Sequence, residues 1–330
     1  MNVLLLGATG LLGHNVLIEL LDRGHRVVAL VRDAARLALP ARFAKHPMLS
    51  LRQGSLLDDE ELQRAATGCD AIVNCAGTTD MSLLHYSDYL PVNRDLPVRL
   101  VATMEPNDIS TLVHVSTANT IGYGSPQQLA DETAQPEPPF SESFYTQSKL
   151  EGECALLAAA VNHPQWHLVI LNPGFMVGAY DTHPSSGKLL LAAYRRRWMA
   201  APKGGKSFVA VGDVAAATAN ALTMGRSAER YLLTGANLSL GEFYALQAKV
   251  CGYRQRLFAL PDALVRLAGR IGDMLRALHI ATQLSTRNVR QLIVREYYTS
   301  EKARRELQFP QTSTADAIEA FFRWYRNEKP

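Results

Sequence analysis

Short apolar runs alternate with segments of helical periodicity along the first half of the chain. Continuous apolar runs are typical of buried strands, whereas apolar positions that recur every three or four residues predict helices. Strands are expected at Val3–Leu6, Val27–Val31, Leu49–Gln53, Ala71–Asn74, Thr111–Val115 and His167–Leu171. Helices are expected at Leu11–Arg23, Asp58–Thr67, Val92–Glu105 and Phe144–Val161. Strands that alternate with helices indicate crossover connections and a parallel sheet with both faces covered.

This alternation predicts an α/β fold with a doubly wound parallel sheet of the Rossmann type. In such a fold the ligand site lies beyond the carboxyl ends of the strands. We expect residues 1–173 to form a nucleotide-binding domain. The pattern loosens afterwards, where Gly, Pro and Ser cluster at 178–187 and 202–207. Residues 174–330 are expected to form a smaller, mixed α/β substrate-binding portion, with some segments returning to the first sheet. Its expected elements are a strand at Tyr231–Thr234 and helices at Ser239–Val250 and Ala315–Tyr325.

The composition narrows the functional classes. The 330 residues carry 34 basic and 31 acidic side chains, a formal charge of +3. That excess is too small to indicate nucleic-acid binding. The four cysteines form no CxxC pair and no metal-ligand spacing with histidine, so we expect free thiols in the cytoplasm and no metal. The N-terminal apolar run leads into a glycine turn, and no window of about 18 apolar residues exists, so neither a signal peptide nor a transmembrane segment is expected.

A glycine-rich turn follows the first predicted strand. Residues 7–13 read GATGLLG and open the first predicted helix. Glycines at this spacing allow a tight turn, a close approach of the backbone to a pyrophosphate and close packing of helix on strand. The N–H groups at the helix start then hold the phosphates. The turn residues expected to bind a dinucleotide are Gly7, Thr9, Gly10, Leu11, Leu12 and Gly13.

Arg32 follows the second predicted strand. An acidic residue in this place would hydrogen-bond the ribose hydroxyls of NAD, whereas an arginine can pair with the 2′-phosphate of NADP. NADP is therefore the expected cofactor. Asp33 comes one position later and keeps NAD open, and a solvated loop arginine is the alternative interpretation of Arg32.

Tyr145 and Lys149 form a YxxxK pair at the start of a predicted helix. Residues four apart on a helix share a face. We expect the ammonium to stabilise the phenolate and to lower the tyrosine pKa from about 10, which makes a general acid and base near neutral pH. This spacing is common by chance and usually forms a surface pair. Its place after the fifth strand of a nucleotide-binding chain gives it meaning.

Hydroxyl side chains end the fifth predicted strand, at Ser116 and Thr117. A hydroxyl at the carboxyl end of a parallel strand faces the ligand crevice, where it can hydrogen-bond a substrate carbonyl. The alternative is that these hydroxyls bond the local backbone. Three further side chains in the loops after strands four and five are expected to contact the substrate: His85, Tyr86 and Asn119.

Together these residues resemble the extended short-chain dehydrogenase/reductase superfamily over essentially the whole chain. Within it, the chain looks most like the dihydroflavonol-reductase-like and 3β-hydroxysteroid-dehydrogenase-like branch. The segments that carry the resemblance are GATGLLG at 7–13, VSTANTIGYG at 115–124, YTQSK at 145–149, NPGFMVG at 172–178 and YTSEKA at 298–303.

The resemblance implies roles for individual residues. Tyr145 would be the proton donor or acceptor, and Lys149 would hold the nicotinamide ribose. The catalytic hydroxyl would lie five residues before Gly122, at Thr117, with Ser116 as the second candidate. Further cofactor contacts implied by the resemblance are Ser55, Leu56, Cys75, Ala76, Gly77 and Pro173.

Two positions qualify this correspondence. The family often has an aspartate after the glycine that ends strand three, where it accepts from the adenine amino group. Here Ser55 stands in that place and accepts more weakly. Asn93 matches a recurrent asparagine whose role is expected to be structural.

Three functions follow as hypotheses. The first is an NADP-dependent oxidoreductase that reduces a ketone or aldehyde of a small organic substrate, or oxidises the corresponding alcohol. The second is a nucleotide-sugar epimerase or dehydratase with tightly bound NAD, against which Arg32 argues. The third is a non-catalytic NADP-binding regulator, against which the intact Tyr145 and Lys149 pair argues. The resemblance also implies a homodimer through the helices near 92–105 and 144–161.

Apolar residues recur at helical spacing in the segment 257–284, with Arg266, Arg270 and Arg276 between them. This segment could form a lid, a membrane-surface contact or a helix packed on the protein's own core. We expect the last of these.

Overall fold

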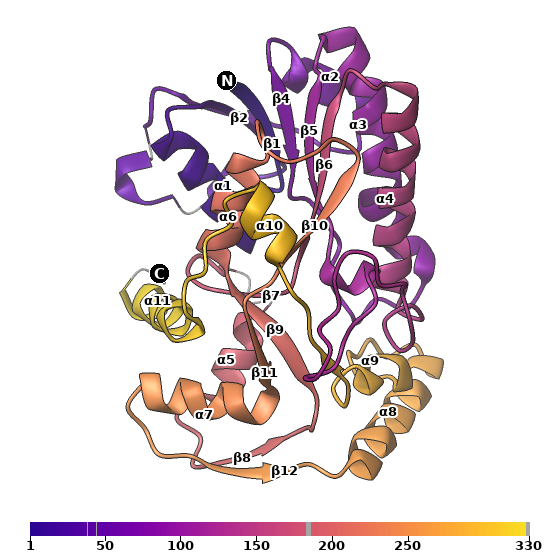
Figure 1. The fold of residues 1–330 in the computed structure, drawn as a ribbon, viewed down its shortest axis with the longest axis vertical. Helices are drawn as coiled ribbons and strands as arrows, with labels where there is room; N and C mark the ends of the chain where they lie inside the picture. Colours follow the sequence, from indigo (N-terminus) through magenta and orange to yellow (C-terminus); the bar gives the residue numbers. More distant parts are fainter. Residues whose placement is uncertain (38, 44, 183–185, 328–330) are drawn as a thin grey trace.

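The computed structural model describes residues 1–37, 39–43, 45–182 and 186–327 (Figure 1). Over these residues, seven parallel strands form the central sheet in the order β10-β6-β5-β4-β1-β2-β3. The strands are β1 (Asn2–Leu6), β2 (Arg26–Val31), β3 (Leu49–Gln53), β4 (Ala71–Asn74), β5 (Thr111–Val115), β6 (His167–Pro173) and β10 (Glu229–Leu233). The predicted doubly wound α/β class is confirmed.

Both faces of the sheet are buried, which is why its strands read as continuous apolar runs. Successive side chains of β1 point to opposite faces. Val3 and Leu5 belong to one core cluster, and Leu4 and Leu6 to the other. The first cluster includes α1 (Leu11–Asp22) and α6 (Val211–Asn220). The second includes α2 (Asp59–Ala66), α3 (Leu96–Met104) and α4 (Phe144–Asn162), on the opposite side in Figure 1.

The helix predicted over Val92–Glu105 begins differently from the expectation. Its first turn, Pro91–Asp95, is π-helical, and regular α-helix starts only at α3. The buried Asn93 lies in this turn. Its side-chain amide donates to the Ser148 hydroxyl at 3.0 Å and to the Thr78 carbonyl at 3.0 Å, and its oxygen accepts from the Thr78 N–H. Asn93 therefore joins a loop to α4, a structural role.

The second half builds two smaller sheets that the sequence analysis largely missed. Strands β7 (Phe175–Val177), β9 (Gly205–Ala210), β11 (Ala236–Ser239) and β13 (Arg295–Glu296) form one, and β8 (Trp198–Ala201) with β12 (Arg256–Ala259) forms the other. The helices are α5 (Gly187–Ala193), α7 (Leu240–Val250), α8 (Asp262–Ala277), α9 (Thr286–Arg290), α10 (Glu301–Glu306) and α11 (Thr314–Asn327). Strand β9 starts inside the 202–207 cluster of Gly, Pro and Ser that suggested a loop.

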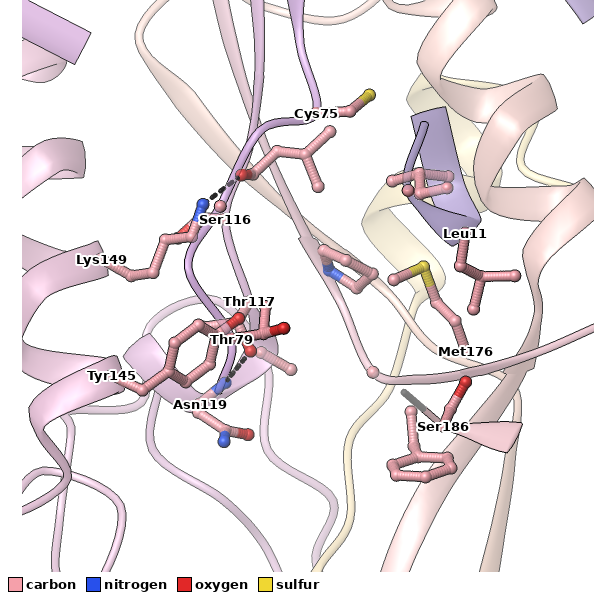
Figure 2. Close-up of a pocket in the computed structure, with 18 of the residues that line it drawn as sticks. Leu11, Cys75, Thr79, Ser116, Thr117, Asn119, Tyr145, Lys149, Met176 and Ser186 are labelled. Atoms are coloured by element: carbon pink, nitrogen blue, oxygen red, sulfur yellow. Dashed lines mark hydrogen bonds between the residues drawn. The ribbon is translucent and has the colours of Figure 1, made fainter. Parts of the chain in front are cut away.

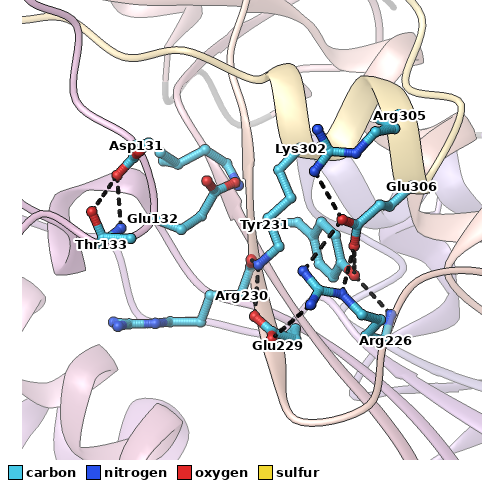
Figure 3. A network of polar contacts seen from close by, with 11 residues as sticks. Asp131, Glu132, Thr133, Arg226, Glu229, Arg230, Tyr231, Lys302, Arg305 and Glu306 are labelled. Atoms are coloured by element: carbon cyan, nitrogen blue, oxygen red, sulfur yellow. Dashed lines mark hydrogen bonds and ion pairs between the residues drawn. The ribbon is translucent and has the colours of Figure 1, made fainter.

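Strand β10 comes from the second half of the chain but pairs with β6 at the edge of the first sheet. A polar network fixes α10 against it (Figure 3). Lys302 donates to the Glu229 carboxylate at 2.7 Å and to the Arg230 carbonyl at 2.6 Å, and the Tyr231 hydroxyl donates to Glu306 at 2.7 Å. Although partial burial opposes it, the hydrogen bonds from Tyr231 and from two arginines lower the pKa of Glu306 to about 2. The YTSEKA segment thus contributes to structure.

Helix α8 packs through one face only. Val265, Gly269 and Gly272 are buried, and a Cβ on Gly272 would lie 2.2 Å from the Leu284 carbonyl. An exposed apolar stripe runs along another face, formed by Leu264, Leu267, Ile271, Met274 and Leu278. The buried face of α8 packs against Thr286 and Val289 of α9 and against Leu284, so the segment packs on its neighbours in the chain through one face. Among the described residues, we find no helix with both the length and the apolar character needed to cross a bilayer.

Candidate active site

A cavity of about 450 Å³ opens at the carboxyl ends of β1, β4, β5 and β6, where the fold class places a ligand. The glycine turn at 7–13 forms one wall and the start of α4 the other. In Figure 2, Tyr145, Thr117 and Asn119 lie on one side of this cavity, and Leu11 and Met176 lie opposite them.

The three glycines of the turn have different surroundings. Gly7 has φ +83°, and a Cβ there would lie 2.7 Å from the Ala76 nitrogen. A Cβ on Gly13 would lie 2.0 Å from the Gly7 carbonyl, so α1 packs on the turn only without a side chain. Gly10 borders the cavity, and its Cβ would meet nothing nearer than the Gly7 oxygen at 3.5 Å. Gly7 and Gly13 therefore have no room for a side chain, while Gly10 leaves its backbone open to the cavity.

Most of the residues expected to bind the cofactor line this one cavity. These are Thr9, Gly10, Leu11, Leu12, Gly13, Cys75, Gly77, Tyr145, Lys149 and Pro173. Gly7 and Ala76 lie in contact beneath the turn. The structure therefore brings the glycine turn and the pair of Tyr145 and Lys149 to one cavity, and the roles of these residues stay predictions.

Arg32, Ser55 and Leu56 lie apart from this cavity, after the ends of β2 and β3. Val31 pairs with Gln53, so the two strand ends are neighbours. The Ser55 hydroxyl accepts from the Leu57 N–H at 3.2 Å and is used locally. Arg32 is exposed. These side chains can meet only the end of a dinucleotide remote from Tyr145.

Lys149 is buried, with 3% of its surface exposed. Its ammonium donates to the Val115 carbonyl at 3.0 Å and lies 3.4 Å from the Ala76 carbonyl. Burial lowers the pKa of Lys149 to about 8, although the carboxylate of Glu153 acts in the opposite direction. A Cβ on Gly77 would lie 3.1 Å from this ammonium, so glycine keeps it accessible from the cavity.

The pKa of Tyr145 differs from the expectation. Burial raises it to about 12, the hydrogen bond with Thr117 lowers it, and the negative charge of Glu153 raises it. The prediction that Lys149 lowers this pKa is wrong in this structure, because the ammonium is directed at the carbonyls of β5 and of the loop after β4. The phenol is therefore protonated at neutral pH.

Thr117 is the strand-end hydroxyl beside Tyr145 (Figure 2). Its oxygen also accepts from the Asn119 N–H at 3.3 Å, so the local-backbone alternative is partly realised. Ser116 lies on the other side, toward Lys149. Its hydroxyl helps to lower the pKa of the buried carboxyl group of Glu153. The arrangement favours Thr117 over Ser116 as the hydroxyl that can reach a ligand next to Tyr145.

Glu153 is a further site residue that the sequence analysis missed. It lies one helical turn after Lys149 on α4 and is fully buried. Its carboxylate accepts from the Thr120 hydroxyl at 2.6 Å and from the Asn172 amide at 2.8 Å, and lies 3.7 Å from Arg230. Burial raises its pKa, which these partners oppose. The sequence does contain a signal for Glu153. Glu153 follows Lys149 by four residues, as Lys149 follows Tyr145, so all three lie on one face of the helix.

The expected substrate contacts are only partly brought to the cavity. Asn119 lines it. His85 is exposed, and the Tyr86 hydroxyl donates to Glu151 at 2.6 Å on the outside of α4, so neither lines the cavity as described. The same loop contributes Thr79 and Met81 instead. From the second half of the chain come contributors that the sequence did not reveal: Phe175, Met176, Lys206, Gln291, Glu296 and Tyr298.

Comparisons with known proteins agree with this geometry. The model of the NAD dependent epimerase/dehydratase family matches residues 3–233. A putative dihydroflavonol 4-reductase of Synechocystis is 28% identical, over 97% of this chain and 93% of that protein. A 4-hydroxy-2-methyl-3-oxo-4-farnesyl-3,4-dihydroquinoline-1-oxide ketoreductase of Stigmatella aurantiaca is 29% identical, over 93% of this chain and 91% of that protein. The crystal structure of a dTDP-glucose 4,6-dehydratase of Streptomyces venezuelae, with NAD bound, superposes with a TM-score of 0.77 at 21% identity, covering 99% and 98% of the two chains.

The different surroundings of the glycines give a testable prediction. Gly10→Ala should fold with an unchanged Tm, because its Cβ has room, and should weaken dinucleotide binding by about tenfold or more, because the methyl group occupies the phosphate surface. Gly13→Ala should lower the Tm, because its Cβ would overlap the Gly7 carbonyl. Thermal unfolding and a fluorescence titration with NADPH measure both. Equal Tm values for the two variants would contradict this assignment.

Proposed function

Because this chain belongs to the NAD dependent epimerase/dehydratase family, we propose that it is an NADP-dependent reductase of a ketone or aldehyde. The family depends on nicotinamide dinucleotides, and the relatives of this chain are oxidoreductases, epimerases and dehydratases. The observation that carries the proposal is the convergence of Tyr145, Lys149 and Thr117 on the cavity that starts at the glycine turn. Two relatives that are named reductases, from Synechocystis and Stigmatella, support reduction as the reaction.

Each side chain has a role in this proposal. The glycine turn at 7–13 would hold a reduced nicotinamide dinucleotide, which would supply the hydride for the carbonyl carbon. Tyr145 donates its phenolic proton to the carbonyl oxygen as the C=O π bond breaks, and Thr117 donates a hydrogen bond to the same oxygen. The phenolate regains its proton from water. The Lys149 ammonium, which is directed at backbone carbonyls beside the cavity and not at the phenol, would hold the nicotinamide ribose. Because burial raises the pKa of Tyr145 to about 12, the phenol is protonated at neutral pH, which is the form that a proton donor needs and which supports reduction as the proposed direction.

NADP is the cofactor we propose, on the evidence of the loop after β2. Asp33 is the residue that could hold the ribose hydroxyls of NAD, but its carboxylate accepts from the Ala35 N–H at 2.9 Å and starts a short 3-10 turn. Arg32 is exposed at the strand end, with its guanidinium available for a 2′-phosphate.

An epimerase or dehydratase that acts with tightly bound NAD is the second candidate. The family model and the dehydratase structure from Streptomyces venezuelae favour it. The two candidates differ in what the purified protein carries. A reductase exchanges its cofactor at each turnover, whereas the alternative would retain NAD through purification.

Tyr145→Phe should lower turnover of a carbonyl panel with NADPH by about a hundredfold or more, because it removes the proton donor. The Kd for NADPH should stay within about twofold, because binding uses the glycine turn. Tyr86→Phe is the matched control, since this neighbouring phenol bonds Glu151 outside the cavity. Steady-state kinetics and a fluorescence titration test both variants. Undiminished turnover in Tyr145→Phe would remove this residue from the mechanism.

Arg32→Ala should weaken NADPH binding by about tenfold or more and leave NADH binding unchanged, because only NADPH has the 2′-phosphate. Arg64→Ala, another exposed arginine, on α2, should change neither affinity. Paired titrations with the two dinucleotides provide the measurement. Tighter binding of NADH than of NADPH by the wild type would contradict the assignment of NADP.

The reaction should lose efficiency as the pH rises. Lys149 has a pKa lowered to about 8, so its charge is complete below that value and lost above it, while Tyr145 stays protonated until about 12. The kcat/KM for reduction should therefore fall as the pH passes about 8. In Glu153→Gln this fall should move to lower pH, because the carboxylate that raises the Lys149 pKa is gone. Glu151→Gln, on the exposed side of α4, should leave the profile unchanged. A profile that stays flat to about pH 10 would contradict this role of Lys149.

A further inference from the structure

The part of the cavity built by the second half of the chain contains four polar side chains that the proposed reaction does not use, three of them buried and one partly buried. Lys206 comes from β9, Glu296 from β13, Gln291 follows α9 and Tyr298 follows β13. All four line the same cavity as Tyr145. They belong to segments that form no part of the nucleotide-binding half.

Three of these side chains have a buried polar atom with no hydrogen-bond partner within the described structure. The atoms are Oε2 of Glu296, Nε2 of Gln291 and the hydroxyl oxygen of Tyr298. The residues are only 4%, 9% and 2% exposed, respectively. Buried polar groups in folded proteins are almost always hydrogen-bonded, because an unmade bond costs free energy. Neighbouring Ser207, in contrast, donates to Asn237. Unpartnered polar atoms on three residues that line one cavity indicate a site for a ligand's polar group.

The charge of this group is balanced. Lys206 and Glu296 are opposite one another in the register of β9 and β13, and the ammonium donates to Oε1 of the carboxylate. The ammonium also lies 5.6 Å from the centre of the Phe175 ring and 6.0 Å from that of Phe140. Its charge is thus compensated by one carboxylate and two aromatic faces. A phosphate or carboxylate entering here would meet the second oxygen of Glu296 and be repelled.

We propose that Glu296, Gln291 and Lys206 form a subsite for a neutral hydroxyl group of the substrate, and that the chain therefore acts on carbonyl compounds that carry such a hydroxyl group. The substrate hydroxyl donates to Oε2 of Glu296 and accepts from Nε2 of Gln291. Lys206 holds the carboxylate in place by its bond to the other oxygen. Met81, Phe175 and Met176 give the same cavity apolar walls, which suit a carbon skeleton. This substrate class rests on the proposed reductase function.

The test uses chain-length series of ketones as probes. Each alkan-2-one from butanone to decan-2-one is compared with its analogue bearing a terminal hydroxyl and with its analogue bearing a terminal carboxylate. At one chain length or more, the hydroxyketone should exceed the parent ketone in kcat/KM by about tenfold or more, because the subsite would otherwise be left unpaired. Equal values at every length, or a preference for the oxo acid, would overturn the proposal.

Variants assign the preference to these residues. Glu296→Gln should reduce the hydroxyketone-to-ketone ratio by about tenfold. Because this change leaves the Lys206 charge unpaired and can impair folding, Gln291→Met provides a second route. It removes Nε2, keeps the ion pair and should lower the same ratio. Glu301→Gln, an exposed glutamate on α10, is the control and should leave the ratio unchanged. An unchanged ratio in a folded Gln291→Met variant and in Glu296→Gln would overturn the assignment.

Calorimetric titration of the same probes into NADPH-loaded Tyr145→Phe separates this proposal from the proposed reaction. If the wild type reduces none of the ketones but the hydroxyketone binds more tightly than its parent, the reductase function fails and the subsite stands. If reduction occurs and no probe pair differs in kcat/KM or Kd, the subsite fails and the function stands. If no probe is reduced and none of the pairs differs in Kd, both fail.

Discussion

The ammonium of Lys149 lies out of water at the carboxyl ends of β4 and β5, where the carbonyls of Ala76 and Val115 surround it. Burying a charge without such partners costs on the order of several kcal/mol. Helix α4 therefore cannot turn or slide on the sheet without losing them. Tyr145 lies one turn earlier on the same helix, so its position beside Thr117 follows from the same constraint. The geometry of the proposed chemistry thus depends on the hydrogen bonds that the buried Lys149 ammonium makes to these two carbonyls.

A second buried charge extends this constraint to the other half of the chain. Glu153, one turn after Lys149, bonds Thr120 and Asn172 and faces Arg230. Arg230 belongs to β10, whose backbone and side chains are held by Lys302 of α10 (Figure 3). Because β10 is the edge strand contributed by the second half, the polar network that fixes it also supports the helix that carries Tyr145.

The two halves of the chain each place one lysine ammonium at the cavity, and the two ammonium groups have different partners. On the side of the first sheet, the Lys149 ammonium is bonded to carbonyls, which carry no net charge, so it retains its positive charge for a ligand. On the side of the second sheet, Lys206 is paired with Glu296, so that wall presents polarity without net charge. The cavity between them therefore has an ammonium bonded only to carbonyls at the end proposed for the dinucleotide and an ion pair at the end proposed for the substrate.

The sequence alone determined the first sheet and the start of the site, because parallel strands buried on both faces are continuous apolar runs and the glycine turn has a fixed local spacing. The second sheet could not be predicted, since its strands are short and depend on distant partners, as Glu296 on Lys206. Sequence spacing placed Tyr145 and Lys149 on one helix face. Only the tertiary structure decided their ionisation, because burial and the direction of the Lys149 ammonium, which no local pattern contains, raise the pKa of one and lower that of the other.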